Sequence, residues 1–254
     1  MKFETKCLHA GYSPKNGEPR VQPIVQSTTY TYDSAEEIGK LFDLQAAGYF
    51  YTRLANPTTN AAEEKITALE GGVATMCTAS GQSAVFYAML NILEAGDHFI
   101  SSSYVYGGTY NLFAHTFKKM GIEVTFVDQD LPLEELKKAI HPNTKAVFAE
   151  TIANPALRVL DIEKFAALAK AAEAPLLVDN TFATPYFCRP IEFGANVVIH
   201  STSKYLDGHA IALGGAITDG GNFNWNNGKY PQLSTPDRSE EHTSELQHSG
   251  ESRM

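Results

Sequence analysis

The chain has 254 residues, of which 43% are hydrophobic and 19% are charged, with a formal net charge of −9 at pH 7. A chain of this length can bury a large core and form one or two domains, and its composition is that of a soluble globular protein. The acidic balance and the lack of a basic cluster argue against a nucleic-acid partner. No stretch approaches the roughly 20 apolar residues of a membrane span. We therefore expect neither nucleic acid nor membrane as a partner.

The first residues, "MKFETKCLHAGY", lack the apolar run of a signal peptide. The three cysteines, Cys7, Cys77 and Cys188, are odd in number and widely spaced. They fit neither a zinc pattern nor a disulfide framework. These features predict a cytoplasmic protein without a metal site.

Helical and strand patterns alternate along the interior. The stretch 59–72 places Ala62, Ile66 and Leu69 on one helical face and ends in two glycines. The helices that follow are expected over 82–96, 109–120 and 133–140 and from Asp161, a good N-cap residue. The strands are expected over 73–78, 97–102, 122–128, 145–151, 175–180, 196–201 and 214–219.

These strands are apolar along most of their length and are separated by amphipathic helices. That pattern indicates an α/β fold with a mostly parallel sheet covered by helices on both faces, which makes three layers. In such sheets ligands bind beyond the carboxyl ends of the strands. The residues that directly follow the strands are therefore the candidates for a site.

Polar residues follow five of the predicted strands: Ser80-Gly81-Gln82, Tyr106, Glu150 with Asn154, Asp179, and Ser201 to Lys204. Each group alone is favoured as a helix cap or turn. The stretch His200-Ser201-Thr202-Ser203-Lys204, for example, is typical of a polar turn with its lysine in water. Together, however, they place a helix N-terminus, an aromatic ring, an amide, an acid and a lysine at one edge of the sheet.

Three of these features point to one cofactor. A helix N-terminus with small residues, as at Ser80-Gly81-Gln82, suits a phosphate. Asp179 at the end of an apolar strand needs a positive partner, such as a protonated pyridine nitrogen. Partial desolvation would make the Lys204 amine a nucleophile toward an aldehyde. Pyridoxal phosphate contains all three groups, with Tyr106 placed to stack on its ring and Asn154 to donate to its 3′-oxygen.

The segments "VDNTFATPYFCRP" and "HSTSKYLDGH" resemble the pyridoxal-phosphate enzymes of cysteine and methionine metabolism, the cystathionine synthase and lyase family. "YFYTRLANPT", "TASGQSA", "YVYGGTY" and "ETIANP" match further signatures in order, over about residues 5 to 236. The resemblance implies an aspartate-aminotransferase-like fold, of which only the large domain is expected here. It implies a Schiff base on Lys204, Asp179 on the ring nitrogen and Tyr106 on the ring. It also implies that Gly81, Gln82, Ser201 and Ser203 bind the phosphate and that Asn154 lies beside the ring hydroxyl and the substrate carboxylate. Ser80 is a further candidate for cofactor binding.

Tyr51 and Arg53 in "YTR" are by themselves typical of a surface strand with a solvated arginine. In the resembling family this pair reaches the phosphate of a neighbouring subunit, a task that suits the planar arginine fork. The resemblance therefore implies a homo-oligomer, a dimer or a tetramer, with a shared site.

Within the family, "HAIALGGAITDGGNFNW" and "GKYPQL" are most similar to the O-acetylhomoserine sulfhydrylase branch. The implied reaction is γ-replacement on O-acetyl-L-homoserine by sulfide or a thiol, giving homocysteine or methionine. Cystathionine γ-synthase and methionine or cystathionine γ-lyase activity remain alternatives. The alternative outside catalysis is an inactive fragment that only holds the cofactor.

The expected organisation has three segments: an N-terminal arm over 1–55, a cofactor-binding large domain over 56–236 and a tail over 237–254. The tail, "DRSEEHTSELQHSGESRM", is nearly devoid of apolar residues, so we expect it to be disordered. It is similar to translated adapter or vector sequence. The resemblance implies a smaller C-terminal domain with a carboxylate-binding arginine, which we expect to be absent here.

Overall fold

The computed structural model describes residues 1–43 and 45–235, which fall into two compact units. Of these described residues, one unit comprises Met1–Ser13 and Ala62–Phe223, and the other comprises residues 14–43, 45–61 and 224–235. The predicted limits at residues 55 and 236 stay a prediction. The predicted tail over 237–254 lies outside the described residues.

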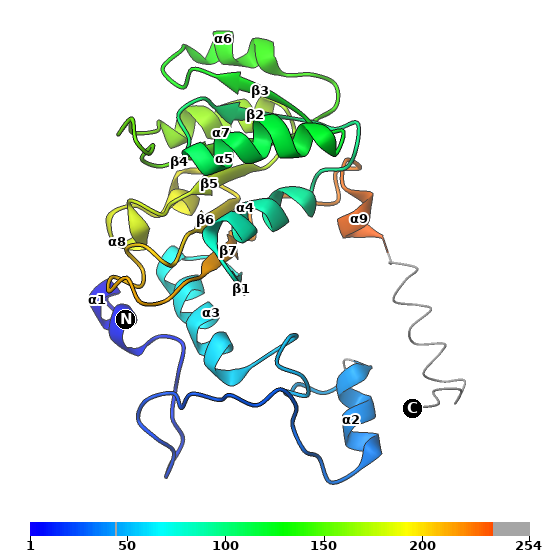
Figure 1. Ribbon diagram of the computed structural model, residues 1–254, viewed down its shortest axis with the longest axis vertical. Helices are drawn as coiled ribbons and strands as arrows, with labels where there is room; N and C mark the ends of the chain where they lie inside the picture. Colours follow the sequence, from blue (N-terminus) through cyan, green and yellow to red (C-terminus); the bar gives the residue numbers. More distant parts are fainter. Residues whose placement is uncertain (44, 236–254) are drawn as a thin grey trace. The chain divides into compact units, whose positions relative to one another are not determined.

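The unit that contains residues 62–223 is built on a seven-stranded sheet with the order β1-β7-β6-β5-β4-β2-β3 (Figure 1). Its strands are β1 (Ala74–Thr78), β2 (His98–Ser102), β3 (Glu123–Val127), β4 (Thr144–Glu150), β5 (Leu176–Asp179), β6 (Val197–His200) and β7 (Gly215–Asp219). All neighbours from β6 to β3 are parallel. Only β7 is antiparallel to its neighbours, β6 and β1. The predicted mostly parallel sheet is confirmed.

The reversal at β7 has a consequence for the site. Because β7 runs against both β6 and β1, β1 runs in the same direction as β6. The carboxyl ends of β1, β2, β4, β5 and β6 therefore meet at one edge of the sheet. All five strand ends that the sequence singled out lie along this edge.

Helices follow most of the strands. The helical segments are α1 (Phe3–His9), α2 (Ala35–Phe42), α3 (Pro57–Glu70), α4 (Gly81–Leu90), α5 (Gly107–Asn111), η1 (Leu112–Phe117), α6 (Leu133–Leu136), η2 (Lys137–Ala139), α7 (Ile162–Ala171), α8 (Thr184–Phe187), η3 (Pro190–Phe193) and α9 (Pro231–Ser234). Ser80 caps α4 by accepting the backbone N–H of Ser83, and Asp161 caps α7 by accepting that of Lys164. Both predicted helix starts are confirmed.

Three helices differ from their predicted form. The helix expected over 82–96 is α4, which ends at Leu90. The helix expected over 109–120 begins at Gly107 as α5 and continues as the π-helix η1, which buries Phe113 and Phe117 completely. The helix expected over 133–140 shortens to α6 and the 3₁₀ turn η2. A hydrophobic period of three to four residues fits all of these helical forms, so it cannot separate them. On α3, Ile66 and Leu69 are buried as expected, but Ala62 is exposed.

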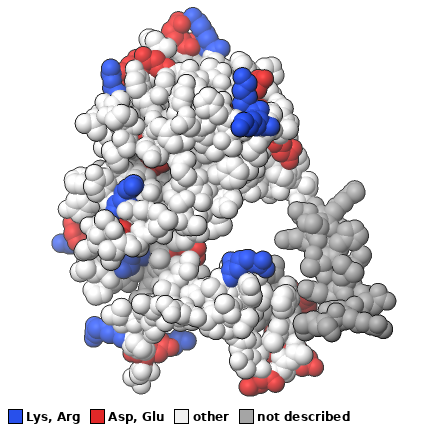
Figure 2. Space-filling view, viewed as in Figure 1, with Lys and Arg blue, Asp and Glu red and all other residues white. Residues whose placement is uncertain are grey.

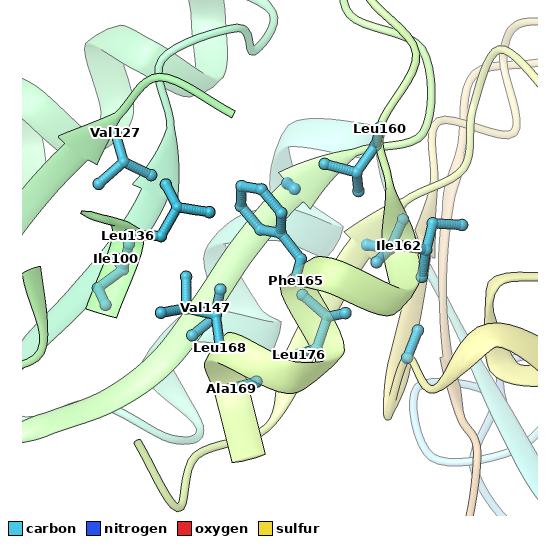
Figure 3. Close-up of a cluster of buried hydrophobic side chains, with 13 residues drawn as sticks. Ile100, Val127, Leu136, Val147, Leu160, Ile162, Phe165, Leu168, Ala169 and Leu176 are labelled. Carbon is cyan, nitrogen blue, oxygen red and sulfur yellow. The ribbon is translucent and has the colours of Figure 1, made fainter. Parts of the chain in front are cut away.

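Side chains from both faces of the sheet form the core. On one face, Phe165 and Leu168 of α7 pack against Val147 and Leu176 of the strands (Figure 3). On the other face, Phe113 of η1 packs edge-to-face against Phe148 of β4, with ring centroids 5.0 Å apart. Since neighbouring residues of a strand point to opposite faces, this alternation gives the three predicted layers.

The described part of the chain contains no helix with both the length and the apolar character needed to cross a bilayer. On the face shown in Figure 2, charged side chains of both signs lie side by side around α6. There Lys137 pairs with Glu134 at 2.7 Å and Lys138 with Glu135 at 2.6 Å.

Polar contacts hold the unit of residues 14–61. Thr29 and Tyr51 form an isolated antiparallel bridge, and the backbone N–H of Thr52 donates to the carbonyl of Thr28 at 2.9 Å. Asn56, almost fully buried, donates to the carbonyl of Val25 at 3.1 Å. Tyr51 and its neighbours are therefore tied to the segment 25–30.

Candidate functional site

A cavity of about 280 Å³ lies at the carboxyl ends of the strands. This volume is close to the lower limit of small-molecule sites, roughly 300 to 1,000 Å³. Nine predicted residues line it: Ser80, Gly81, Gln82, Tyr106, Asn154, Asp179, Ser201, Ser203 and Lys204. Five further residues complete the lining: Glu150, Ile152, Thr181, Phe182 and Leu213.

The start of α4 is packed directly against the loop that follows β6. A Cβ atom on Gly81 would lie 2.4 Å from the Cβ of Ser201 and 2.8 Å from its Cα. Only glycine permits this approach, which brings the N-terminus of a ten-residue helix into the cavity. Gln82 donates to the hydroxyl of Thr109 at 3.1 Å and so links α4 to α5.

Tyr106 stands at the start of α5 with 48% of its surface exposed. A Cβ on Gly108 would lie 2.6 Å from Cε1 of the Tyr106 ring. The glycine therefore allows the ring to fold back over the start of its own helix. The backbone N–H of Tyr106 donates to Oε1 of Glu150 at 2.6 Å.

Asp179 ends β5 and is fixed by Thr181. One oxygen of Asp179, Oδ1, accepts the backbone N–H of Thr181 at 3.0 Å and its hydroxyl at 2.5 Å. The same hydroxyl accepts the backbone N–H of Ser201 at 2.8 Å. Burial raises the pKa of Asp179 above its ordinary value, against the lowering effects of the Thr181 hydrogen bonds and of His200. Asp179 would gain from a positive partner in the cavity, as the sequence predicted.

Glu150 is the second carboxyl group of the cavity. It ends β4 and is the register partner of Asp179 on β5, so both side chains leave the same face of the sheet. Burial, and after it the charge of Asp179, raise the pKa of Glu150 to about 8, against the lowering effect of the backbone N–H groups of Tyr106 and Asn154. The sequence placed Glu150 at this edge but assigned it no role.

A buried polar cluster lies next to Asp179 along the chain. Glu70 and His200, both 0% exposed, are hydrogen-bonded through Oε1 and Nε2. Asn180 donates to the same oxygen of Glu70 at 3.1 Å and accepts the hydroxyl of Thr151 at 2.8 Å. The cluster joins the end of α3 to the ends of β5 and β6.

Lys204 lines the cavity within a polar turn after β6. The hydroxyl of Ser203 donates to the carbonyl of Gly214 at 3.1 Å and accepts its N–H at 3.0 Å, which closes the loop between β6 and β7. The residue Lys204 is exposed, so the expected partial desolvation is not seen in this structure. The segment that follows β6 is thus a polar turn, and its residues Ser201, Ser203 and Lys204 line the cavity, while their roles toward a cofactor stay a prediction.

Tyr51 and Arg53 belong to the other unit and are not among the residues that line the cavity. The Arg53 guanidinium lies 5.1 Å from the centroid of the Tyr51 ring. Their predicted role at a neighbouring subunit's phosphate stays a prediction.

The groups that line the cavity fit pyridoxal phosphate. They comprise a helix N-terminus flanked by hydroxyls at the Ser80 and Ser201 end, an amine at Lys204 and a carboxyl at Asp179. A phosphate, an aldehyde and a ring nitrogen are the groups that such residues bind.

The family model for the Cys/Met metabolism PLP-dependent enzymes matches residues 4–240. The chain belongs to this family. The cofactor of the family, pyridoxal phosphate, is the one that the strand-end residues predicted. The family also confirms the predicted fold class and the predicted resemblance.

The relatives agree with this assignment. The chain is 48% identical over 240 residues to the O-acetyl-L-homoserine sulfhydrylase of Leptospira meyeri, covering 94% of this chain and 54% of that protein. It is 44% identical over 214 residues to the L-methionine gamma-lyase of Fusobacterium nucleatum, covering 84% of this chain and 54% of that protein. The chain therefore spans about half the length of the curated relatives it matches.

A solved structure gives the same result. The Campylobacter jejuni protein assigned as O-acetylhomoserine (thiol)-lyase superposes with a TM-score of 0.89 at 38% identity, covering 94% of this chain and 60% of that one. That protein carries N′-pyridoxyl-lysine-5′-monophosphate at its position 205.

Sequence reasoning placed two further polar residues of the site at the strand ends but assigned them no role. Thr181 follows the last residue of β5 by two positions, and its hydroxyl bridges Asp179 and Ser201. Glu150 ends β4 as Asp179 ends β5, so its position was a usable signal. Ile152, Phe182 and Leu213 gave none, because apolar residues next to strands are common.

Proposed function

We propose that the protein catalyses a pyridoxal-phosphate-dependent γ-replacement on O-acetyl-L-homoserine, with sulfide or a thiol as the nucleophile and homocysteine or methionine as the product. The observation that carries this proposal is the meeting of Lys204, Asp179 and the N-terminus of α4 at one cavity. The sulfhydrylase relative, at 48% identity, supports the choice of substrate.

Each of the nine predicted residues that line the cavity has a proposed task. Lys204 bonds to the aldehyde, and Asp179 holds the ring nitrogen with its proton. Tyr106 stacks on the ring and Asn154 lies beside the ring hydroxyl. Ser80, Gly81, Gln82, Ser201 and Ser203 surround the phosphate. The modified lysine of the Campylobacter protein supports the assignment of Lys204.

When bound, pyridoxal phosphate supplies an aldehyde and an electron-withdrawing ring. The protein supplies proton transfer and orientation. The Lys204 amine, when free, would be the base that takes the proton from the substrate α-carbon and returns protons to the substrate. The Asp179 carboxylate, fixed by Thr181, keeps the ring nitrogen protonated.

An elimination without replacement is a second candidate, since the L-methionine gamma-lyase of Fusobacterium nucleatum is 44% identical. The two reactions differ in what they need. A γ-lyase releases a 2-oxo acid and ammonia from its substrate without any added sulfide. A sulfhydrylase forms homocysteine from O-acetyl-L-homoserine only when sulfide is present.

We propose that the site is completed across a subunit interface, with Tyr51 and Arg53 at the neighbouring phosphate, and that the protein works in the cytoplasm. The close pairing of Arg53 with Tyr51 supports the first proposal, because it orders the guanidinium group. Cys7, Cys77 and Cys188 are free thiols, which suits a reducing compartment.

Borohydride reduction tests the cofactor assignment. After incubation with pyridoxal phosphate and reduction, peptide mass analysis should find the pyridoxyl group on Lys204. The Lys204→Ala chain should lose it, and a control chain with the exposed Lys170 replaced by alanine should keep it. Label on Lys145 or Lys170 in place of Lys204 would overturn the assignment. Bound cofactor without product would favour a binding protein over an enzyme.

A further inference from the structure

Glu150 makes contacts that the reaction does not explain. Its side chain is buried at the end of β4, with 5% of the residue exposed. Its Oε1 accepts the backbone N–H of Tyr106, 44 residues earlier in the chain, at 2.6 Å. The backbone N–H of Asn154 is also directed toward this carboxyl group and lowers its pKa.

Both partners of this carboxyl group belong to loops at the cavity. Tyr106 lies on the loop after β2, and Asn154 lies on the loop after β4. The two loops carry the residues assigned to the ring face and to the ring hydroxyl. One buried side chain thus holds the backbone of both.

The loop of Tyr106 is also held at its beginning, where the backbone N–H of Ser103 donates to the carbonyl of Val127 at 2.8 Å. At Tyr106 itself, no side chain caps α5, and a Cβ on the next residue, Gly107, would meet nothing within 4 Å. Gly107 and Gly108 leave the backbone free to adopt other conformations. The hydrogen bond to the buried carboxyl group therefore fixes the loop at the residue that carries the ring.

We propose that Glu150 is a positioning residue of the cofactor site, which holds the Tyr106 and Asn154 loops against the cavity through their backbone N–H groups. The proposal rests on the proposed function, because it assigns Glu150 an effect on pyridoxal phosphate binding. Glu150 acts through the two loops and has no assigned contact with the cofactor.

Affinity for pyridoxal phosphate tests the proposal. Glu150→Ala removes the acceptor, and the dissociation constant for pyridoxal phosphate should rise about tenfold or more, which corresponds to about 1.4 kcal/mol or more, because the Tyr106 loop is then no longer held in place. Glu150→Gln keeps an oxygen for the N–H of Tyr106 and should stay within about threefold of wild type. Glu163→Ala, at an exposed glutamate of α7, is the matched control and should not change the affinity.

A double-mutant cycle separates positioning from general loosening of the fold. If Glu150 acts through Tyr106, Glu150→Ala should weaken binding clearly less in a Tyr106→Ala background than in wild type. Equal effects in both backgrounds would overturn the proposal. So would a Glu150→Ala chain with lowered melting temperature and unchanged affinity, or a failure of Glu150→Gln to restore affinity.

Three further outcomes are decided by the same measurements. If Glu150→Ala does not fold, Glu150→Met fills the same space without an acceptor and takes its place in the cycle. If the wild-type chain binds no pyridoxal phosphate, the proposed function fails and this proposal fails with it. If wild type binds and both Glu150 variants match it, only the positioning role is wrong.

Discussion

Asp179 and Glu150 place two carboxyl groups on neighbouring strands, at register positions that face the same side of the sheet. Two such groups cannot both be ionised in a buried site without a strong repulsion. The pKa of each is raised, with burial as the largest cause. A cation beside them removes this penalty, so the cavity favours a positively charged ring nitrogen by its own electrostatics.

This pair predicts a pH dependence of stability in the cofactor-free chain. A carboxyl group with a pKa raised by folding holds its proton more tightly in the folded state. Its contribution to stability is therefore lost as the pH rises from its ordinary value of 4.5 to about 8. The free energy of unfolding should fall by up to about 1.4 kcal/mol per pH unit in this window.

Glu150→Gln should reduce that slope, because the glutamine does not titrate. Urea unfolding at pH values about one unit apart, from about 5 to about 8, measures this dependence of the free energy of unfolding on pH. The control is Glu163→Gln, at an exposed glutamate. If the free energy of unfolding fell equally steeply with pH in wild type and in Glu150→Gln, that result would contradict the raised pKa of Glu150.

Glu70 and His200 form a second buried pair, away from solvent. Glu70 uses Oε1 for both His200 and Asn180, while its Oε2 and the Nδ1 of His200 have no hydrogen-bond partner in the described part of the chain. A charge or polar group left alone at such a site is strongly destabilising.

Replacing Glu70 by alanine should thus destabilise the chain by about 3–5 kcal/mol, because His200 and Asn180 lose their shared acceptor in a buried place. The control is Glu64→Ala, at an exposed glutamate of the same helix, which should stay within about 0.5 kcal/mol of wild type. Chemical unfolding measures the free energy of unfolding of both variants. A loss for Glu70→Ala no larger than that of its control would show that the cluster contributes nothing to stability.

At the scale of the elements, the contact between α4 and the loop after β6 joins two parts of the cavity lining. The helix start is defined by the Ser80 cap, and the close approach is possible because residue 81 has no side chain. Strand β6 then delivers Ser201 opposite this helix start. The two elements are about 120 residues apart in the chain, at Gly81 and Ser201, and are brought together by the sheet order.

Gly81→Ala should separate these elements. The added methyl group would lie 2.4 Å from Ser201 Cβ, so we expect a loss of about 1–3 kcal/mol in stability and a weaker affinity for pyridoxal phosphate. Gly107→Ala is the matched control at another helix start of the same cavity edge. Its methyl group would meet nothing within 4 Å, and it should be neutral or stabilise by up to about 1 kcal/mol. Thermal unfolding and cofactor titration distinguish the two, and similar results for both would contradict the packing argument.

At the scale of the whole molecule, the proposed site draws on more than one subunit. Within one chain, the residues that line the cavity belong to the compact unit of residues 62–223, and Arg53 belongs to the compact unit of residues 14–61. If Arg53 completes the phosphate site of a neighbouring subunit, a single chain cannot form the whole site.

Mixing two inactive variants tests this proposal in the complete protein. Arg53→Ala and Lys204→Ala should each be nearly inactive. After dissociation and random pairing, about half of the dimers are mixed and each has one intact site, which gives about a quarter of wild-type homocysteine formation. No recovery, with exchange verified by mass, would place Arg53 and Lys204 in the same subunit's site.

Much of this site was predictable from sequence, for a specific physical reason. Apolar strands and capped helices are local patterns, so the sheet strands and the starts of α4 and α7 followed from neighbouring residues. The edge rule for parallel sheets then gathered Asp179, Lys204 and Ser80 without any coordinates. The π-helical form of η1 was not predictable, because the burial of Phe113 and Phe117 against the sheet decides it.

The sequence by itself determined which chemical groups the strands carry to one edge, since strand ends and residue types are local properties. Only the tertiary structure decided which neighbours surround those groups and how deeply they are buried. The antiparallel β7 turned β1 so that Ser80 joined the others, and the register of β4 and β5 set Glu150 beside Asp179. Burial and the charge of a register partner come from residues that are distant in the chain, and they determine how tightly Glu150 holds its proton.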